Sequence, residues 1–125
     1  MNKFRESLNK NDVKLKIISA NEARQMMKDL DNYILLDVRT PSEYSKIRIP
    51  GAKLIPVDEL IKRAAFEFVD ELPDKHIPIL VYCQSGMRAK IAAKILIDMG
   101  YTGVVSFGGI ANWTYETVRD KGDNQ

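Results

Sequence analysis

The sequence of 125 residues contains only one cysteine, Cys83, and one histidine, His76. No disulfide can form within one chain, and a closed zinc site of three or four Cys and His ligands cannot be assembled from it. Any catalytic pair of a cysteine or serine with a histidine would have to use His76. Structural zinc and a disulfide framework are therefore excluded, and the free thiol suits a reducing compartment.

Glycine, proline and an excess of one charge are also scarce. With 7 Gly, 5 Pro, 45% hydrophobic and 29% charged residues, the chain does not fit the collagen-like, low-complexity or disordered classes. The 19 Lys and Arg against 17 Asp and Glu give a formal net charge of +2. Such a balance argues against a partner that is nucleic acid or an anionic membrane. We expect a single domain over 1–125, with its core at about 13–120 and polar, frayed ends at 1–11 and 121–125.

Long apolar runs are missing as well. The first fourteen residues mix charged side chains with isolated apolar ones, unlike the apolar segment of a secretory signal. The longest uncharged stretch, 99–115, is interrupted by glycines and falls short of the roughly 20 apolar residues that cross a membrane. We therefore expect a soluble, cytoplasmic protein.

Predicted strands and helices alternate along the chain. Apolar runs predict strands at 15–18, 33–38, 52–55, 77–82 and 103–107. Helical spacing or start signals predict helices at 20–30, after Thr40, at 60–68, at 87–99 and at 109–118. Ser19 with Glu22 forms a capping-box pattern, and Thr40 with Glu43 repeats it. The short joints predict an α/β fold whose central sheet is mainly parallel, with about five strands and helices on both faces.

In such a sheet, ligands bind beyond the carboxyl ends of the strands. The residues that follow strands are Asp37 and Arg39, the turn near Pro56, the segment Cys83 to Arg88, and Gly108 with Gly109. We interpret Asp37 and Arg39 as a buried or half-buried ion pair that braces this edge of the sheet. Trp113 is expected to pack on the sheet from a helix, and His76 to lie on the surface.

The segment from Cys83 to Arg88 is the strongest candidate site. It joins a strand to a helix, where backbone N–H groups and the helix N-terminus favour an anion and hence the thiolate form of Cys83. Gly86 lets the loop curl, Ser85 can orient the sulfur, and Arg88 adds positive charge. The alternative is that Cys83 is a small buried apolar residue and Arg88 a solvated one.

Four segments, in order along the chain, resemble the motifs of one family. They are Leu36-Asp37-Val38-Arg39 with Glu43-Tyr44, Ile49-Pro50-Gly51-Ala52 with Ile55-Pro56, Cys83-Gln84-Ser85-Gly86-Met87-Arg88, and Gly108-Gly109-Ile110 with Trp113. Through them the sequence resembles the rhodanese family of sulfurtransferases from about Ile17 to Trp113. The resemblance implies a rhodanese-like fold.

The resemblance also implies an activity. Cys83 would be the nucleophile that carries a persulfide, and the amides of Gln84, Ser85, Gly86, Met87 and Arg88 would hold the terminal sulfur, with Asp37 and Arg39 in support. A small donor such as thiosulfate would supply sulfur to a thiol or cyanide acceptor, or to a sulfur-relay protein. No metal or organic cofactor is implied.

Two other functions remain open. One is a non-catalytic sulfur carrier or partner-binding module. The other is a Cys-dependent phosphatase or arsenate reductase, which is disfavoured because such relatives have five residues between Cys and Arg, whereas this chain has four, Gln84 to Met87.

The chain also departs from the family at two places. Ile47-Arg48 replaces the usual Gly-His, and Gln84 and Met87 are neutral, whereas some thiosulfate-using members have basic side chains inside the loop. Arg88, with Arg39 or Arg48, would therefore have to attract a dianionic donor.

Overall fold

The computed structural model describes residues 15–66 and 68–121. The ends that we expected to be frayed, 1–11 and 121–125, lie outside the described residues except for Lys121.

A five-stranded sheet forms the centre of the protein. Its strands are β1 (Lys16–Ile17), β2 (Ile34–Asp37), β3 (Lys53–Leu54), β4 (Ile79–Cys83) and β5 (Val104–Gly109). They lie in the order β1-β5-β4-β2-β3, and every neighbouring pair is parallel. All five residues of the central strand β4 are buried, as expected of a parallel strand covered on both faces. The prediction of a parallel α/β sheet is confirmed.

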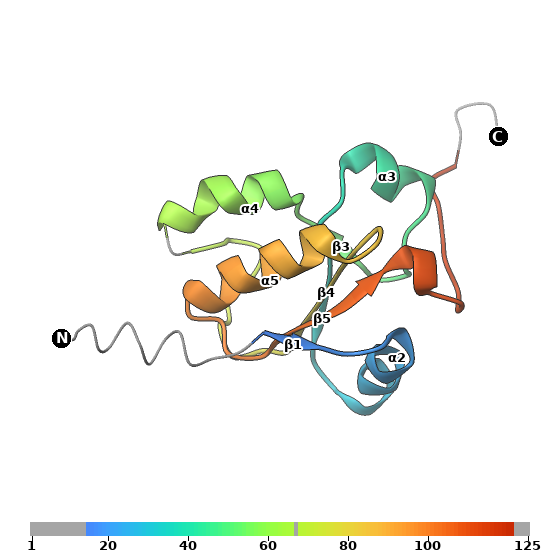
Figure 1. Ribbon diagram of the computed structural model, residues 1–125, viewed down its shortest axis with the longest axis horizontal. Helices are drawn as coiled ribbons and strands as arrows, with labels where there is room; N and C mark the ends of the chain where they lie inside the picture. Colours follow the sequence, from blue (N-terminus) through green and yellow to red (C-terminus); the bar gives the residue numbers. More distant parts are fainter. Residues whose placement is uncertain (1–14, 67, 122–125) are drawn as a thin grey trace.

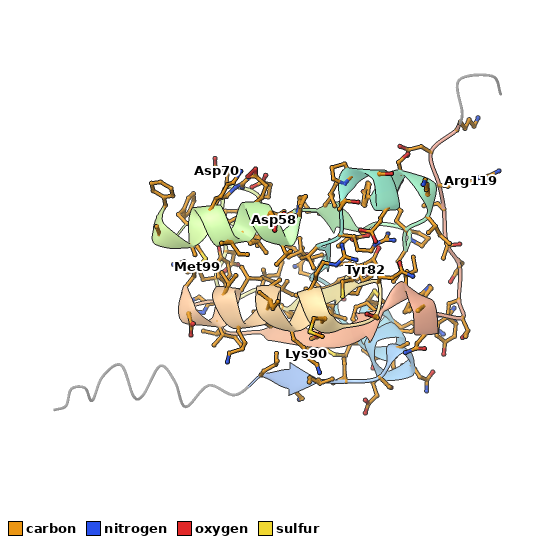
Figure 2. The ribbon with its side chains drawn as sticks, turned by 45° about the horizontal axis from the view of Figure 1, so that its top comes forward. Asp58, Asp70, Tyr82, Lys90, Met99 and Arg119 are labelled. Atoms are coloured by element: carbon orange, nitrogen blue, oxygen red, sulfur yellow. The ribbon has the colours of Figure 1, made fainter. Side chains whose placement is uncertain are left out.

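Helices cover both faces of this sheet (Figure 1). They are α2 (Ala20–Asp29), α3 (Pro41–Lys46), α4 (Val57–Arg63) and α5 (Met87–Asp98), with short 3₁₀ turns η1 (Ala64–Phe66) and η2 (Ile110–Asn112). Successive strand residues point to opposite faces. Leu36 and Val81 therefore pack in a core shared with α4 and α5, whereas Leu35 and Tyr82 pack in a second core with α2. Tyr82 lies inside the molecule, and the charged Asp58 and Lys90 lie outside (Figure 2).

Both predicted capping boxes are present. The Ser19 side chain accepts a hydrogen bond from the Glu22 amide at 3.0 Å, and Glu22 accepts one from the Ser19 amide at 2.9 Å. Thr40 and Glu43 repeat the arrangement at the start of α3, with distances of 3.2 and 2.9 Å. The second box therefore holds the Glu43 side chain at the first turn of α3, just beyond the carboxyl end of β2.

The predicted helix at 109–118 is wrong. One 3₁₀ turn, η2, is followed by extended chain, in which Val118 forms an isolated antiparallel bridge with Arg48. The backbone N–H and C=O of Val118 both bond to Arg48, at 2.8 and 2.9 Å, so they need no helical partners. Trp113 is buried against Phe107, as expected, but it does not pack from a helix.

Two helical faces also differ from the prediction. The helix expected over 60–68 ends as α4 at Arg63 and continues only as η1. Leu60 is buried, whereas Ile61 and Phe68 are 52% and 50% exposed. Ile91 in α5 is exposed as well. Neighbouring helix positions point about 100° apart, so packing against one partner buries a single stripe of each helix.

Candidate active site

The Cys83 loop lies at the carboxyl edge of the sheet. Cys83 is the last residue of β4, and Met87 is the first residue of α5. Gly86, the residue before α5, has a φ of +117°, a backbone conformation that favours glycine. This curl brings the Gly86 amide to the sulfur, and it donates a hydrogen bond to Cys83 Sγ at 2.9 Å.

The end of β5 supports the loop from the side. Gly109 pairs with Cys83 in the sheet, and a Cβ atom at Gly109 would lie 2.1 Å from the carbonyl oxygen of Gln84. The same oxygen accepts a hydrogen bond from the Ala111 amide at 3.1 Å. The absence of a side chain at Gly109 therefore allows the Gln84 peptide to pack directly on β5.

The sulfur lies at the base of the loop. Cys83 is 1% exposed and belongs to the core beneath α5, whereas Gln84, Ser85 and Met87 form an exposed rim. Of the five loop amides, that of Gly86 bonds to Cys83 Sγ. The prediction that these amides hold the terminal sulfur of a persulfide concerns an atom beyond Sγ, and it stays a prediction.

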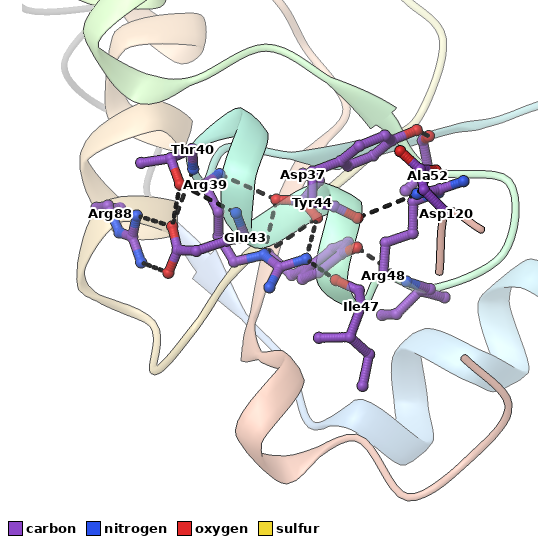
Figure 3. A network of polar contacts seen from close by, with 12 residues as sticks. Asp37, Arg39, Thr40, Glu43, Tyr44, Ile47, Arg48, Ala52, Arg88 and Asp120 are labelled. Atoms are coloured by element: carbon purple, nitrogen blue, oxygen red, sulfur yellow. Dashed lines mark hydrogen bonds and ion pairs between the residues drawn. The ribbon is translucent and has the colours of Figure 1, made fainter. Parts of the chain in front are cut away.

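Arg88 pairs with Glu43, a residue that the sequence indicated only as a helix-start signal and part of a motif. Nη1 and Nη2 of Arg88 donate hydrogen bonds to Oε1 and Oε2 of Glu43 at 2.7 and 3.0 Å (Figure 3). The hydrogen bonds from Arg88, with those from Thr40, lower the pKa of Glu43 to about 2. Glu43 in turn raises the pKa of Arg88, and a thiolate at Cys83 would add to the same shift. Arg88 is thus within electrostatic reach of the sulfur, but its guanidinium is already paired with a carboxylate.

Asp37 and Arg39 form the expected ion pair, and it is fully buried, with exposed fractions of 0% and 1%. Arg39 Nε and Nη2 lie 3.0 and 2.7 Å from the Asp37 carboxylate oxygens. Burial opposes the charge of Arg39, but the hydrogen bond and charge of Asp37 outweigh it and raise the pKa of Arg39. Arg39 also donates to the carbonyl of Ile47, so it ties β2 to the chain that follows α3.

Arg48, at the position where the family motif has histidine, turns away from the loop. It forms an ion pair with Asp120 at 2.8 Å, donates to the Tyr44 carbonyl and lies over the Tyr44 ring at 4.5 Å. Arg39 and Arg48 are therefore engaged elsewhere, which corrects the expectation that they help Arg88 to attract a dianion.

Two other residues considered in the sequence analysis, His76 and Pro56, lie outside the Cys83 loop. His76 is exposed in a polar loop before β4, as predicted, and its Nδ1 lies 3.2 Å from Thr102 Oγ1. Pro56 precedes α4 as its N-cap.

Within residues 15–66 and 68–121, no three His, Cys, Asp or Glu side chains gather so that they could hold a metal ion. No helix in the described part of the chain is long and apolar enough to span a bilayer.

Comparison with known proteins shows the family. Residues 19–116 match the model of the rhodanese-like domain. Thiosulfate sulfurtransferase PspE of Escherichia coli is 39% identical over 84 residues, which cover 67% of this chain and 77% of that protein. Thiosulfate:glutathione sulfurtransferase of Saccharomyces cerevisiae is 30% identical over 115 residues, which cover 86% of this chain and 83% of that protein.

A solved structure agrees with this result. A rhodanese with anions from E. coli has a TM-score of 0.61 and 34% identity, and the match covers 70% of this chain and 99% of that one. With a parallel sheet of matching topology and a cysteine loop between its central strand and the next helix, the chain belongs to the rhodanese-like domain family.

Proposed function

We propose that the protein is a sulfurtransferase that carries sulfur as a persulfide on Cys83. The observation that carries this proposal is the position of the Cys83 sulfur, which lies at the base of a strand-to-helix loop and accepts a hydrogen bond from the Gly86 amide. A hydrogen bond from an N–H group and the N-terminus of the 12-residue helix α5 both stabilise negative charge on the sulfur.

The reaction would proceed in two displacements. The Cys83 thiolate attacks the outer sulfur of a donor such as thiosulfate, the S–S bond of the donor breaks, and sulfite leaves with the electron pair. An acceptor thiolate or cyanide then attacks the outer sulfur of the persulfide. The second S–S bond breaks, the sulfur leaves on the acceptor, and the Cys83 thiolate is regenerated.

The buried position of Sγ is compatible with this role. A persulfide places its outer sulfur about 2 Å beyond Sγ. We propose that the amides of Gln84, Ser85, Met87 and Arg88, which do not bond to Sγ, stabilise charge on that outer atom and on the leaving group. Asp37 and Arg39 would support the loop by fixing the neighbouring end of β2.

The names of the relatives favour the same activity. One is named for thiosulfate and the other for thiosulfate and glutathione, which is a thiol. A small sulfur donor and a thiol or cyanide acceptor are therefore the substrates to test first.

The test is transfer of one sulfur atom to Cys83. The protein is incubated with thiosulfate and, separately, with an alkyl persulfide, and its intact mass is measured before and after addition of cyanide. After removal of free donor, we expect the mass of one added sulfur, its loss with cyanide, and thiocyanate equal to the sulfur lost, none of which should occur with Cys83→Ser. Absence of loading with both donors would refute the proposal.

Two other results would favour the alternative functions. Loading without turnover to cyanide or thiols would favour a sulfur carrier. Hydrolysis of an aryl phosphate that Cys83→Ser abolishes would favour a phosphatase.

A further inference from the structure

The guanidinium of the Cys83 loop is neutralised by a carboxylate. The side chains of Gln84, Ser85, Gly86 and Met87 carry no charge, so Arg88 supplies the guanidinium of the loop. That guanidinium is held by Glu43 through two hydrogen bonds. Arg39 and Arg48 are matched in the same way by Asp37 and Asp120.

Glu43 is well placed to keep this pair closed. Its Oε1 also accepts hydrogen bonds from the amide and the hydroxyl of Thr40, at 2.9 and 3.1 Å. Thr40 therefore orients the carboxylate independently of Arg88. The hydrogen bonds from Arg88 lower the pKa of Glu43 to about 2, so it stays ionised near neutral pH. The two side chains are 31% and 32% exposed, so the pair lies where an arriving donor can meet it.

The charge of the donor decides how it responds to such a pair. Thiosulfate carries two negative charges and must approach a thiolate, so it depends on a nearby cation. An alkyl persulfide without other ionisable groups carries at most one. Glu43 accepts from two of the five N–H donors of Arg88, so a dianion that reaches the other donors meets an ion pair without net charge and gains little attraction from it.

We propose that Glu43 is a specificity-determining residue: by occupying Arg88, it makes the site favour sulfur donors of low charge, such as alkyl persulfides, over dianions such as thiosulfate. This inference rests on the proposed sulfurtransferase function, and it assigns Glu43 a role beyond bracing α3 against α5.

The test compares two donors in Glu43→Gln. Glutamine at the third helical position preserves the capping box, so the change removes the charge and releases Arg88 without removing the cap. The rate constant of sulfur loading on Cys83 is measured by intact mass with thiosulfate and with an uncharged-tail alkyl persulfide, at low ionic strength. We expect the rate with thiosulfate to rise on the order of tenfold and the rate with the persulfide to change less than about twofold. Added salt should reduce the gain.

Glu22→Gln is the matched control. Glu22 occupies the same position in the capping box of α2, so the substitution changes the net charge equally without touching the pair of Glu43 with Arg88. It should leave both loading rates unchanged. A rise with thiosulfate in both variants would overturn the proposal, because the effect would then come from overall charge.

Other outcomes separate this inference from the proposed function. Equal slowing of both donors in Glu43→Gln would show a bracing role and overturn the inference, as would an unchanged ratio. Failure of the wild-type protein to load from either donor would instead overturn the proposed function. Arg88→Gln gives a second test should Glu43→Gln not fold: the unpaired Glu43 should lower the rate with thiosulfate on the order of tenfold relative to the persulfide. An equal effect on both donors in this variant would also overturn the inference.

Discussion

Asp37 and Arg39 place opposite charges where water reaches neither of them. A buried charge that loses its partner is left without compensation, which is costlier than the loss of an exposed pair. We expect Asp37→Asn to lower the free energy of unfolding by about 3–5 kcal/mol in urea denaturation. Asp120→Asn breaks the pair with Arg48, in which the Asp120 side chain is 54% exposed, and should lower the free energy of unfolding far less. Equal losses in the two variants would argue against a bracing role for the buried pair.

Glu43 also makes stability depend on pH. Its pKa in the folded protein is about 2, below the ordinary value of 4.5, so the carboxylate contributes stability above about pH 4.5 and loses it as the pH falls towards 2. We expect Glu43→Gln to be less stable than the wild type by about 1 kcal/mol at pH 7, a value reduced for a partly exposed pair. The difference should close as the pH falls, which urea denaturation at a series of pH values would measure. A constant difference from pH 7 to about pH 2 would show that the ion pair is not its source.

At the scale of secondary-structure elements, the contact between β5 and the Cys83 loop positions the site. A methyl group at Gly109 would collide with the backbone of Gln84 and Ser85, so Gly109→Ala must displace the loop. Small displacements of reacting groups are costly, and we expect the rate of sulfur loading to fall on the order of 100-fold. Intact-mass kinetics would measure it.

Gly108→Ala is the control for this effect. Gly108 has a φ of +83°, so the substitution strains the backbone, but no atom lies within 4 Å of the new Cβ. It should lower stability by about 1–2 kcal/mol and leave loading within a few-fold of the wild type. Similar loading rates in the two variants would contradict a positioning role for Gly109.

The elements that the sequence predicted well depend on short-range contacts. The capping boxes at Ser19 and Thr40 join residues three apart, so local sequence suffices to indicate where α2 and α3 begin. The segment after η2, which was predicted as part of a helix, is extended instead because Val118 pairs with Arg48, a residue far away in the sequence. Helical spacing cannot reveal such a partner.

At the scale of the whole molecule, the C-terminal segment (residues 113–121) returns to α3. Besides the bridge between Arg48 and Val118, the Asp120 amide donates to the Ser45 carbonyl at 2.9 Å. A chain that ends at Thr117 loses these contacts, and we expect it to be less stable by about 1–3 kcal/mol in urea denaturation. Amide hydrogen exchange of α3 should become faster.

A chain that ends at Lys121 keeps both contacts and is the control for this truncation. It should be more stable than the chain that ends at Thr117, with slower exchange in α3. Unchanged exchange in α3 after loss of residues 118–125 would show that the C-terminal segment does not stabilise it.

The amino-acid sequence sufficed to predict the alternation of strands and helices as far as β5, the parallel sheet, the curl at Gly86 and the position of Cys83 at the end of the central strand. These features follow from hydrophobic periodicity, short connections, capping and glycine geometry, which involve residues close in the chain. Three further features emerge only in the folded chain: Cys83 is buried, Glu43 holds Arg88, and Asp120 holds Arg48. Burial and electrostatic pairing depend on distance in space, and folding brings these partners together from distant parts of the sequence.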